Sequence, residues 1–133
     1  MIDNRQQTID NRRMAVHNFK ELIVWKKSID LAAEVYQVVS VFPRDERFGL
    51  TSQIKRAVVS VASNIAEGSG RNSDKEFVHF LGIAKGSAYE LLTQLFIADK
   101  LGLLKSDDAG EIMNKVEEVQ KMIHGFQEKL KNR

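Results

Sequence analysis

Glu76 and His79 form an E-x-x-H pair, a spacing that places a carboxylate and an imidazole on one face of a helix. Di-iron sites in four-helix bundles need two such pairs and further inward-facing glutamates. The other histidines offer no second pair, because His17 lies near the N-terminus and His124 follows Lys121 at this spacing. The serines lack a G-x-S-x-G elbow, and the chain has no cysteine. We therefore expect no catalytic residue, no metal site and no cofactor, and predict that the protein is not an enzyme.

The stretch SNIAEGSGRNSDKEF (residues 63–77) contains two glycines that invite comparison with a phosphate-binding loop. A Walker A loop needs G-x-x-x-x-G-K-[ST] after a strand. Here Gly68 and Gly70 are two residues apart, and no lysine follows at the required offset. Gly68 instead stands where a helix C-cap glycine is typical, and Ser73-x-x-Glu76 is a capping box before an apolar run. The stretch therefore predicts a tight corner between two antiparallel helices.

Four segments carry apolar residues at alternating spacings of three and four, the pattern of a helix with one buried face. The predicted helices span about residues 20–41, 50–67, 74–101 and 107–131. The predicted apolar seam of the first is Leu22, Trp25, Ile29, Ala32, Tyr36 and Val39. The other seams are Leu50, Ile54, Val58, Val61 and Ile65; Phe77, Leu81, Ala84, Ala88, Leu91, Leu95 and Ala98; and Ile112, Val116, Val119, Ile123, Phe126 and Leu130. Trp25 and Tyr36 are thus interpreted as core residues and not as platforms for stacking bases.

Boundary signals separate these segments by short corners. Phe42-Pro43 ends the first helix, because proline disfavours helix in the residue before it. Gly102 ends the third, and Ser106 or Asp107 is expected to cap the fourth. Short corners between four helices predict an all-α fold, an antiparallel up-down-up-down four-helix bundle over residues 19–133.

Bulk properties restrict the class of protein. A chain of 133 residues suits one domain, and the absence of cysteine fits a reducing cytoplasm. The polar start does not resemble a secretory signal, and no uninterrupted apolar run reaches about 18 residues, so no membrane association is expected. Residues 1–18, in which Ile-Asp-Asn-Arg occurs at 2–5 and 9–12, are predicted to form a flexible N-terminal arm.

Two features on the predicted helices are candidates for a subunit interface. Polar residues recur at spacings of three and four on one face of the second helix: Gln53, Arg56, Ser60, Asn64 and Glu67. Solvent, RNA, a polar subunit interface or an interhelical hydrogen-bond network would each suit this face. Gly82 and Gly86 form a GxxxG in the third helix, where each glycine costs about 1 kcal/mol relative to alanine. Close approach of another helix, from this chain or from another subunit, would offset that cost.

Basic residues gather at both ends of the predicted bundle, although the net charge is only +2. The topology places these candidates at one end: Arg44, Arg47, Lys55 and Arg56, with Lys100 and Lys105. It places these nearer the other end: Lys26, Lys27, Arg71 and Lys75, with Arg12, Arg13, Lys20, Lys129, Lys131 and Arg133. The first four of each group are the candidate nucleic-acid contacts, since a repeated basic patch binds phosphates more strongly than a single one.

The chain resembles the four-helix bundle family of proteins encoded in intervening sequences of bacterial 23S rRNA genes. The matching stretches are FKELIVWKKS (Phe19–Ser28), VY (Val35-Tyr36), FPRDERFGLTSQIKRAVVSVASNIAEGSGR (Phe42–Arg71), SDKEFVHFLGIAKGSAYELLTQL (Ser73–Leu95) and LG (Leu101-Gly102). The resemblance implies the bundle fold and a ring of five subunits, and it implies no enzyme. A related branch serves as the accessory protein of diversity-generating retroelements, where it binds the reverse transcriptase and nucleic acid. Ala62 stands where the family often has proline, and nothing carries over to the segment before Val16.

Three functional hypotheses follow. The first is a non-catalytic, homo-pentameric scaffold that binds RNA or a nucleoprotein through its basic surface. The second is a structural or protein-partner adaptor with no affinity for nucleic acid. An enzyme with a metal or pocket site is the third and least favoured.

Overall fold

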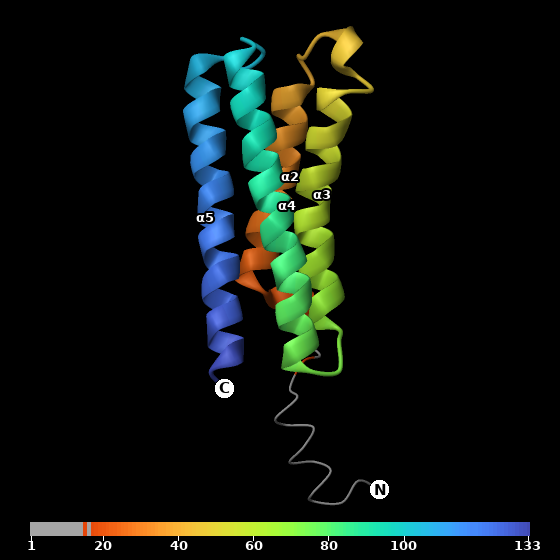
Figure 1. Cartoon of the computed structure of the whole chain (residues 1–133), viewed down its shortest axis with the longest axis vertical. Coiled ribbons are helices and arrows are strands. Elements are labelled where there is room, and N and C mark those ends of the chain that lie inside the picture. Colours follow the sequence, from red (N-terminus) through yellow and green to blue (C-terminus); the bar gives the residue numbers. More distant parts are fainter. Residues whose placement is uncertain (1–14, 16) are drawn as a thin grey trace, which may run out of the picture.

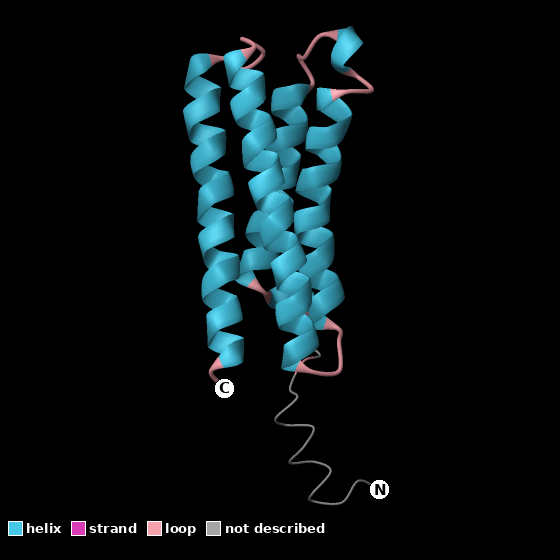
Figure 2. Cartoon of the chain, in the orientation of Figure 1, coloured by secondary structure: helices cyan, strands magenta, loops and turns pink. Residues whose placement is uncertain are grey.

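Helices make up the described part of the chain, which in this computed structural model comprises residue 15 and residues 17–133. The long helices are α2 (Ile23–Val39), α3 (Leu50–Ser69), α4 (Asp74–Lys100) and α5 (Ser106–Lys131). Two 3-10 turns, η1 (Phe19–Glu21) and η2 (Arg44–Glu46), precede α2 and α3. Figure 2 shows helices joined by loops throughout the described residues, so the all-α prediction is confirmed.

Each long helix packs against two others and closes a four-membered bundle. Contacts join α2 to α3, α3 to α4, α4 to α5, and α5 back to α2. The α2–α3 and α4–α5 connections lie at one end, and the α3–α4 corner lies at the other end, near the C-terminus (Figure 1). The predicted up-down-up-down bundle is confirmed. Along the described chain, no helix combines the length and apolarity needed to cross a bilayer.

The core contains the predicted seams of three helices. All seven seam residues of α4, from Phe77 to Ala98, are fully buried. The seams of α3 and α5 are buried as well, with Leu50 and Phe126 packed at their margins. Burial of these faces supplies the main driving force for the fold, at about 25 cal/mol per Å² of apolar surface.

The predicted seam of α2 is right only in part, because Val39 is buried and Trp25 packs against the core, but the centre of the buried face lies part of a turn away. The buried residues of this helix are Val24, Ser28, Leu31, Val35 and Val39. Ile29 and Tyr36 are 41% and 42% exposed, while Trp25 packs half-buried against the core. Ser28 explains the rotation, because its hydroxyl donates to the carbonyl of Trp25 at 2.6 Å and therefore enters the core without an unsatisfied polar atom.

The predicted corner exists, but Gly68 is not its cap. Helix α3 continues through Ser69, and Gly70 is the C-cap. Gly68 is buried, and an added Cβ would lie 2.7 Å from Cβ of Phe80 and 2.8 Å from Cδ1 of Phe77. This glycine is therefore required by close packing of α3 on α4. The predicted capping box is confirmed in its N-cap half, because Ser73 Oγ accepts from the Glu76 N–H at 3.2 Å. The Glu76 carboxylate accepts from the Ser73 hydroxyl, also at 3.2 Å, in place of the Ser73 backbone N–H.

The α4–α5 corner agrees with the prediction at one end only. Gly102 has φ +74°, and Leu103 N–H donates to the Ala98 carbonyl at 2.9 Å, so α4 ends in a Schellman motif. Neither Ser106 nor Asp107 caps α5. The N-cap position is Lys105, which makes no side-chain cap bond, and Asp107 lies in the first turn, where its charge suits the helix dipole.

The end of the bundle near the C-terminus is held by residues distant in sequence. Arg133 donates to both carboxylate oxygens of the buried Asp74, at 2.7 and 3.1 Å. The His17 N–H donates to the Ser69 carbonyl at 2.7 Å, and burial lowers the pKa of the His17 imidazole. Ala15 is buried too, so contact with the bundle begins before residue 19. The remainder of the expected arm, including the Ile-Asp-Asn-Arg repeat, lies outside the described residues.

Candidate nucleic-acid and subunit interfaces

A groove of about 600 Å³ lies between α2 and α3, at the end of the bundle where η2 joins them. Its lining includes Tyr36, Arg47, Phe48, Lys55, Arg56 and Val59. No acidic residue is among the described residues that line it. Within the described chain, no carboxylate lies within ion-pair distance of Arg47, Lys55 or Arg56. The groove therefore combines three basic side chains with apolar and aromatic surface.

Two aromatic rings of this groove each lie against a basic side chain. Lys55 Nζ lies 4.9 Å from the centroid of the Tyr36 ring, and the Arg47 guanidinium lies 5.3 Å from that of Phe48. Phe48 is 87% exposed. The prediction that Tyr36 belongs to the core is therefore wrong, and Phe48 drew no functional prediction because it falls in a corner without periodicity.

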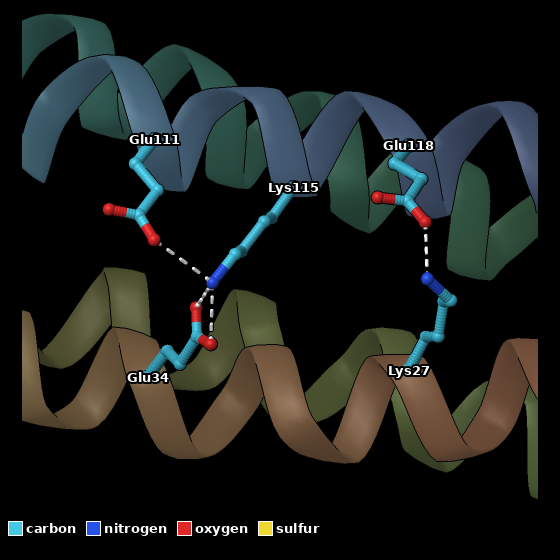
Figure 3. Close-up of polar contacts among 5 residues, drawn as sticks. All are labelled: Lys27, Glu34, Glu111, Lys115 and Glu118. Carbon is cyan, nitrogen blue, oxygen red and sulfur yellow. Dashed lines mark hydrogen bonds and ion pairs between the residues drawn. The ribbon is translucent and has the colours of Figure 1, made fainter.

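A second groove lies between α2 and α5, and most of its charged lining residues form ion pairs across it (Figure 3). Lys115 donates to both carboxylate oxygens of Glu34, at 2.7 and 2.8 Å, and lies 3.3 Å from Glu111. The hydrogen bond to Glu34 raises the pKa of Lys115. Lys27 pairs with Glu118. Lys27, a candidate nucleic-acid contact, thus has an acidic partner on α5.

The remaining candidate contacts lie apart from these two grooves. Arg71 pairs with Glu67 at 3.1 Å, and its guanidinium stacks over Phe80 at 4.5 Å. Lys75 shares a shallow groove with Arg71, beside Glu76 and His79. Two further candidates, Arg44 in η2 and Lys26 in α2, are exposed. The structure therefore brings together Arg47, Lys55 and Arg56, and separately Arg71 and Lys75.

The polar row of α3 forms an interhelical hydrogen-bond network over part of its length. Ser60 Oγ lies 2.8 Å from Ser87 Oγ on α4, and Asn64 Nδ2 donates to Ser60 Oγ at 3.0 Å. Gln53 and Arg56, nearer the start of α3, are exposed. The network alternative therefore accounts for the middle of the row and leaves its first members free for other contacts.

The two glycines of the GxxxG have different surroundings. An added Cβ at Gly82 would lie 3.4 Å from Nε2 of Gln127 on α5, whereas one at Gly86 would meet no described atom within 4 Å. Packing within the chain thus involves Gly82 only. Large apolar side chains are exposed along the same outer side of α4: Ile83, Tyr89, Phe96 and Ile97. A helix that is apolar on its outer side as well as its buried side is typical of one with a further neighbour.

Comparison with known proteins decides the family. Residues 20–125 match the family described as 23S rRNA-intervening sequence protein. The chain belongs to this family. It is also similar in structure to a crystal structure of a protein with unknown function from the S23 ribosomal protein family of Bacteroides thetaiotaomicron VPI-5482. That similarity has a TM-score of 0.72 at 23% identity and covers 79% of this chain and 98% of the other, which supports the fold. None of the curated proteins compared with the chain matches it.

Proposed function

We propose that the protein is a non-catalytic RNA-binding scaffold that assembles as a homo-pentamer and needs no cofactor. The observation that carries this proposal is the α2–α3 groove, in which Arg47, Lys55 and Arg56 lie together without an acidic partner among the described residues. Basic side chains left unpaired at one place are available to neutralise phosphates, which dominate the affinity of proteins for nucleic acids.

The family supports a nucleic-acid partner. The family is described as 23S rRNA-intervening sequence protein, and a branch related to it, the accessory protein of diversity-generating retroelements, binds a reverse transcriptase and nucleic acid. RNA, alone or within a nucleoprotein, is accordingly the ligand we favour.

The outer side of α4 supports the assembly. An exposed apolar row surrounds Gly86 and consists of Ile83, Tyr89, Phe96 and Ile97. A Cβ added at Gly86 would meet no described atom within 4 Å, so packing within the described chain does not require a glycine there. A second copy of the chain would bury this row, and Gly86 would let the two backbones approach closely. Gln53, exposed on the neighbouring helix, is a candidate polar contact of the same interface, whereas Arg56 is assigned to the basic groove. A ring would repeat the basic groove and raise the avidity for a long RNA.

The same apolar row also favours a second candidate, a protein-partner adaptor without affinity for nucleic acid. A heterologous protein would cover the row as well as a second copy would. The two candidates differ in what accompanies the chain during purification.

Native mass spectrometry of the chain purified gently and without nuclease separates them. Five chains carrying heterogeneous extra mass that nuclease removes is the expected result. Five chains without RNA would favour the adaptor. A bare monomer would contradict the assembly.

The substitution G86A tests the interface. We expect it to stabilise the isolated subunit by up to about 1 kcal/mol through helix propensity, and to weaken the assembly because a methyl group separates the helices. The matched control is G125A on α5, where an added Cβ likewise meets no described atom within 4 Å. It should stabilise equally without changing the mass distribution. Equal assembly of both variants and the parent chain would remove Gly86 from the interface.

A further inference from the structure

We propose that the α2–α3 groove binds unpaired nucleotides, with a base stacked on Phe48 and the flanking phosphates held by Arg47, Lys55 and Arg56. This inference rests on the proposed function and makes it specific, because it names both the site and the class of RNA: single-stranded segments instead of duplex.

Exposed aromatic surface argues for a base. Phe48 is 87% exposed and shares the groove with Tyr36 and Val59, which are 42% and 43% exposed. One exposed apolar side chain is ordinary, but several that gather in one groove mark a binding surface. Unpaired bases stack on such rings and on guanidinium groups like that of Arg47, which already lies over Phe48.

The electrostatics of the groove argue for a phosphate chain. Its three basic residues face no carboxylate among the described residues within ion-pair distance. Helix α3 also begins here without an acidic residue in its first turn, whereas α4 begins with Asp74 and Glu76. A carboxylate does lie near this helix start, because Glu46 Oε2 is 3.6 Å from the position of a Cβ added at Gly49, the N-cap residue of α3. The phosphate chain is therefore assigned to the three cations and not to the helix dipole.

The volume of the groove and a buried hydroxyl in its lining also suit an unpaired nucleotide. Its volume of about 600 Å³ lies within the usual range of ligand clefts, roughly 300–1,000 Å³. Thr51 lines it, is only 9% exposed, and has a hydroxyl without a hydrogen-bond partner among the described groups. Such an atom is costly until a partner satisfies it. A duplex keeps its bases stacked within the helix, so only an unpaired segment presents both a base face and polar edges to the groove.

Fluorescence anisotropy with the full chain tests the proposal. The probes are a labelled oligouridylate of about 12 nucleotides and a labelled RNA duplex of similar length. We expect the oligouridylate to bind more tightly than the duplex. F48L, at an 87% exposed position, should weaken oligouridylate binding about tenfold and leave duplex binding unchanged. The matched control is F80L on α4, where the ring likewise lies against a guanidinium, that of Arg71 at 4.5 Å, but outside both the groove and the apolar row, and it should change neither.

Each outcome decides one question. If the parent chain binds neither probe at low salt, the proposed function fails and the inference fails with it. If the parent chain binds RNA but F48L and F80L behave alike, or the duplex binds as tightly as the oligouridylate, the inference alone fails. Equal affinity for an oligothymidylate, a single-stranded DNA, would mean that the groove recognises the base and the phosphate and does not require the 2′-hydroxyl of RNA. Circular dichroism melts and native masses of both variants must match those of the parent chain.

Discussion

Helix α2 packs against α5 on one flank and against α3 on the other, and the basic side chains along these flanks have different partners. On the α5 flank, Lys27 and Lys115 pair with Glu118 and Glu34 (Figure 3). On the α3 flank, Lys55 and its basic neighbours contact aromatic rings or solvent and no carboxylate among the described residues. The two grooves are similar in architecture and opposite in charge balance.

The difference shows that basic side chains on the two flanks of one helix can serve different purposes. Exposed ion pairs contribute little stability, but each one neutralises a cation that an RNA could otherwise use. The net charge of +2 conceals this local separation, because Asp30, Glu34 and Glu118 line the α2–α5 groove while no described acid lines the α2–α3 groove. The α3 flank is the candidate site because its basic residues have no carboxylate partner among the described residues, and not because it has more basic residues.

The largest expected effect comes from neutralising the α3 flank. R47Q/K55Q/R56Q should weaken oligouridylate binding about a hundredfold near 0.1 M salt, because three phosphate contacts are lost. At about 0.7 per contact, the slope of log K against log salt should become shallower by about 2. Anisotropy titrations over a salt series measure both.

The control for this variant neutralises the other flank. K27Q/K115Q removes two cations that already have acidic partners, so RNA affinity should change little. An equal loss in both variants would mean that net charge matters and the groove does not, and the comparison would fail.

A smaller effect is expected from giving the α3 flank an acid of its own. S52E places a carboxylate three residues before Lys55 and four before Arg56, in the first turn of α3. It should reduce RNA affinity about tenfold and raise stability by about 0.5 kcal/mol through the helix dipole and i,i+4 pairing. S52Q, of nearly the same size without the charge, should do neither. Anisotropy and urea unfolding report the two effects separately.

The smallest expected effect concerns the α5 flank. K115M should lower the urea midpoint slightly and leave RNA binding unchanged, and the difference from the parent chain should vanish near 1 M salt, where the screening length is about 3 Å. Because the pKa of Lys115 is raised in the folded state, its contribution is complete at neutral pH and is lost as pH rises through that raised value. A salt-independent loss of stability would mean that the Lys115 stem matters for packing and its charge does not.

The sequence predicted most of the fold and little of the site. The seams of α3, α4 and α5 were predictable because their buried apolar residues keep an unbroken spacing, which a few buried polar residues such as Ser87 and Gln94 do not interrupt. The seam of α2 was not, because Ser28 interrupts it and an alternative set of apolar residues lies about a quarter turn away. The hydrogen bond that admits Ser28 to the core is invisible in residue type alone.

The sequence did not indicate which lysines are paired or that aromatic side chains line the groove, for two reasons. Lys27 and Glu118 are 91 residues apart, so no local spacing indicates that this lysine is paired. Phe48 lies in an irregular corner, where period-based reasoning assigns no face. The cluster of Arg44, Arg47, Lys55 and Arg56 at one end was predicted from topology, and the structure brings the last three into one groove.

Gly68 has a consequence for how these surfaces work. Its backbone touches Phe77 and Phe80, so sliding α4 along α3 by one residue, about 1.5 Å, would drive an aromatic ring into the last turn of α3. The two helices are thereby locked in axial register. The basic groove is lined mainly by α3 and the apolar row lies on α4, so the spacing of the two surfaces is set before any ligand arrives. Binding at either surface then loses little conformational entropy to ordering the scaffold.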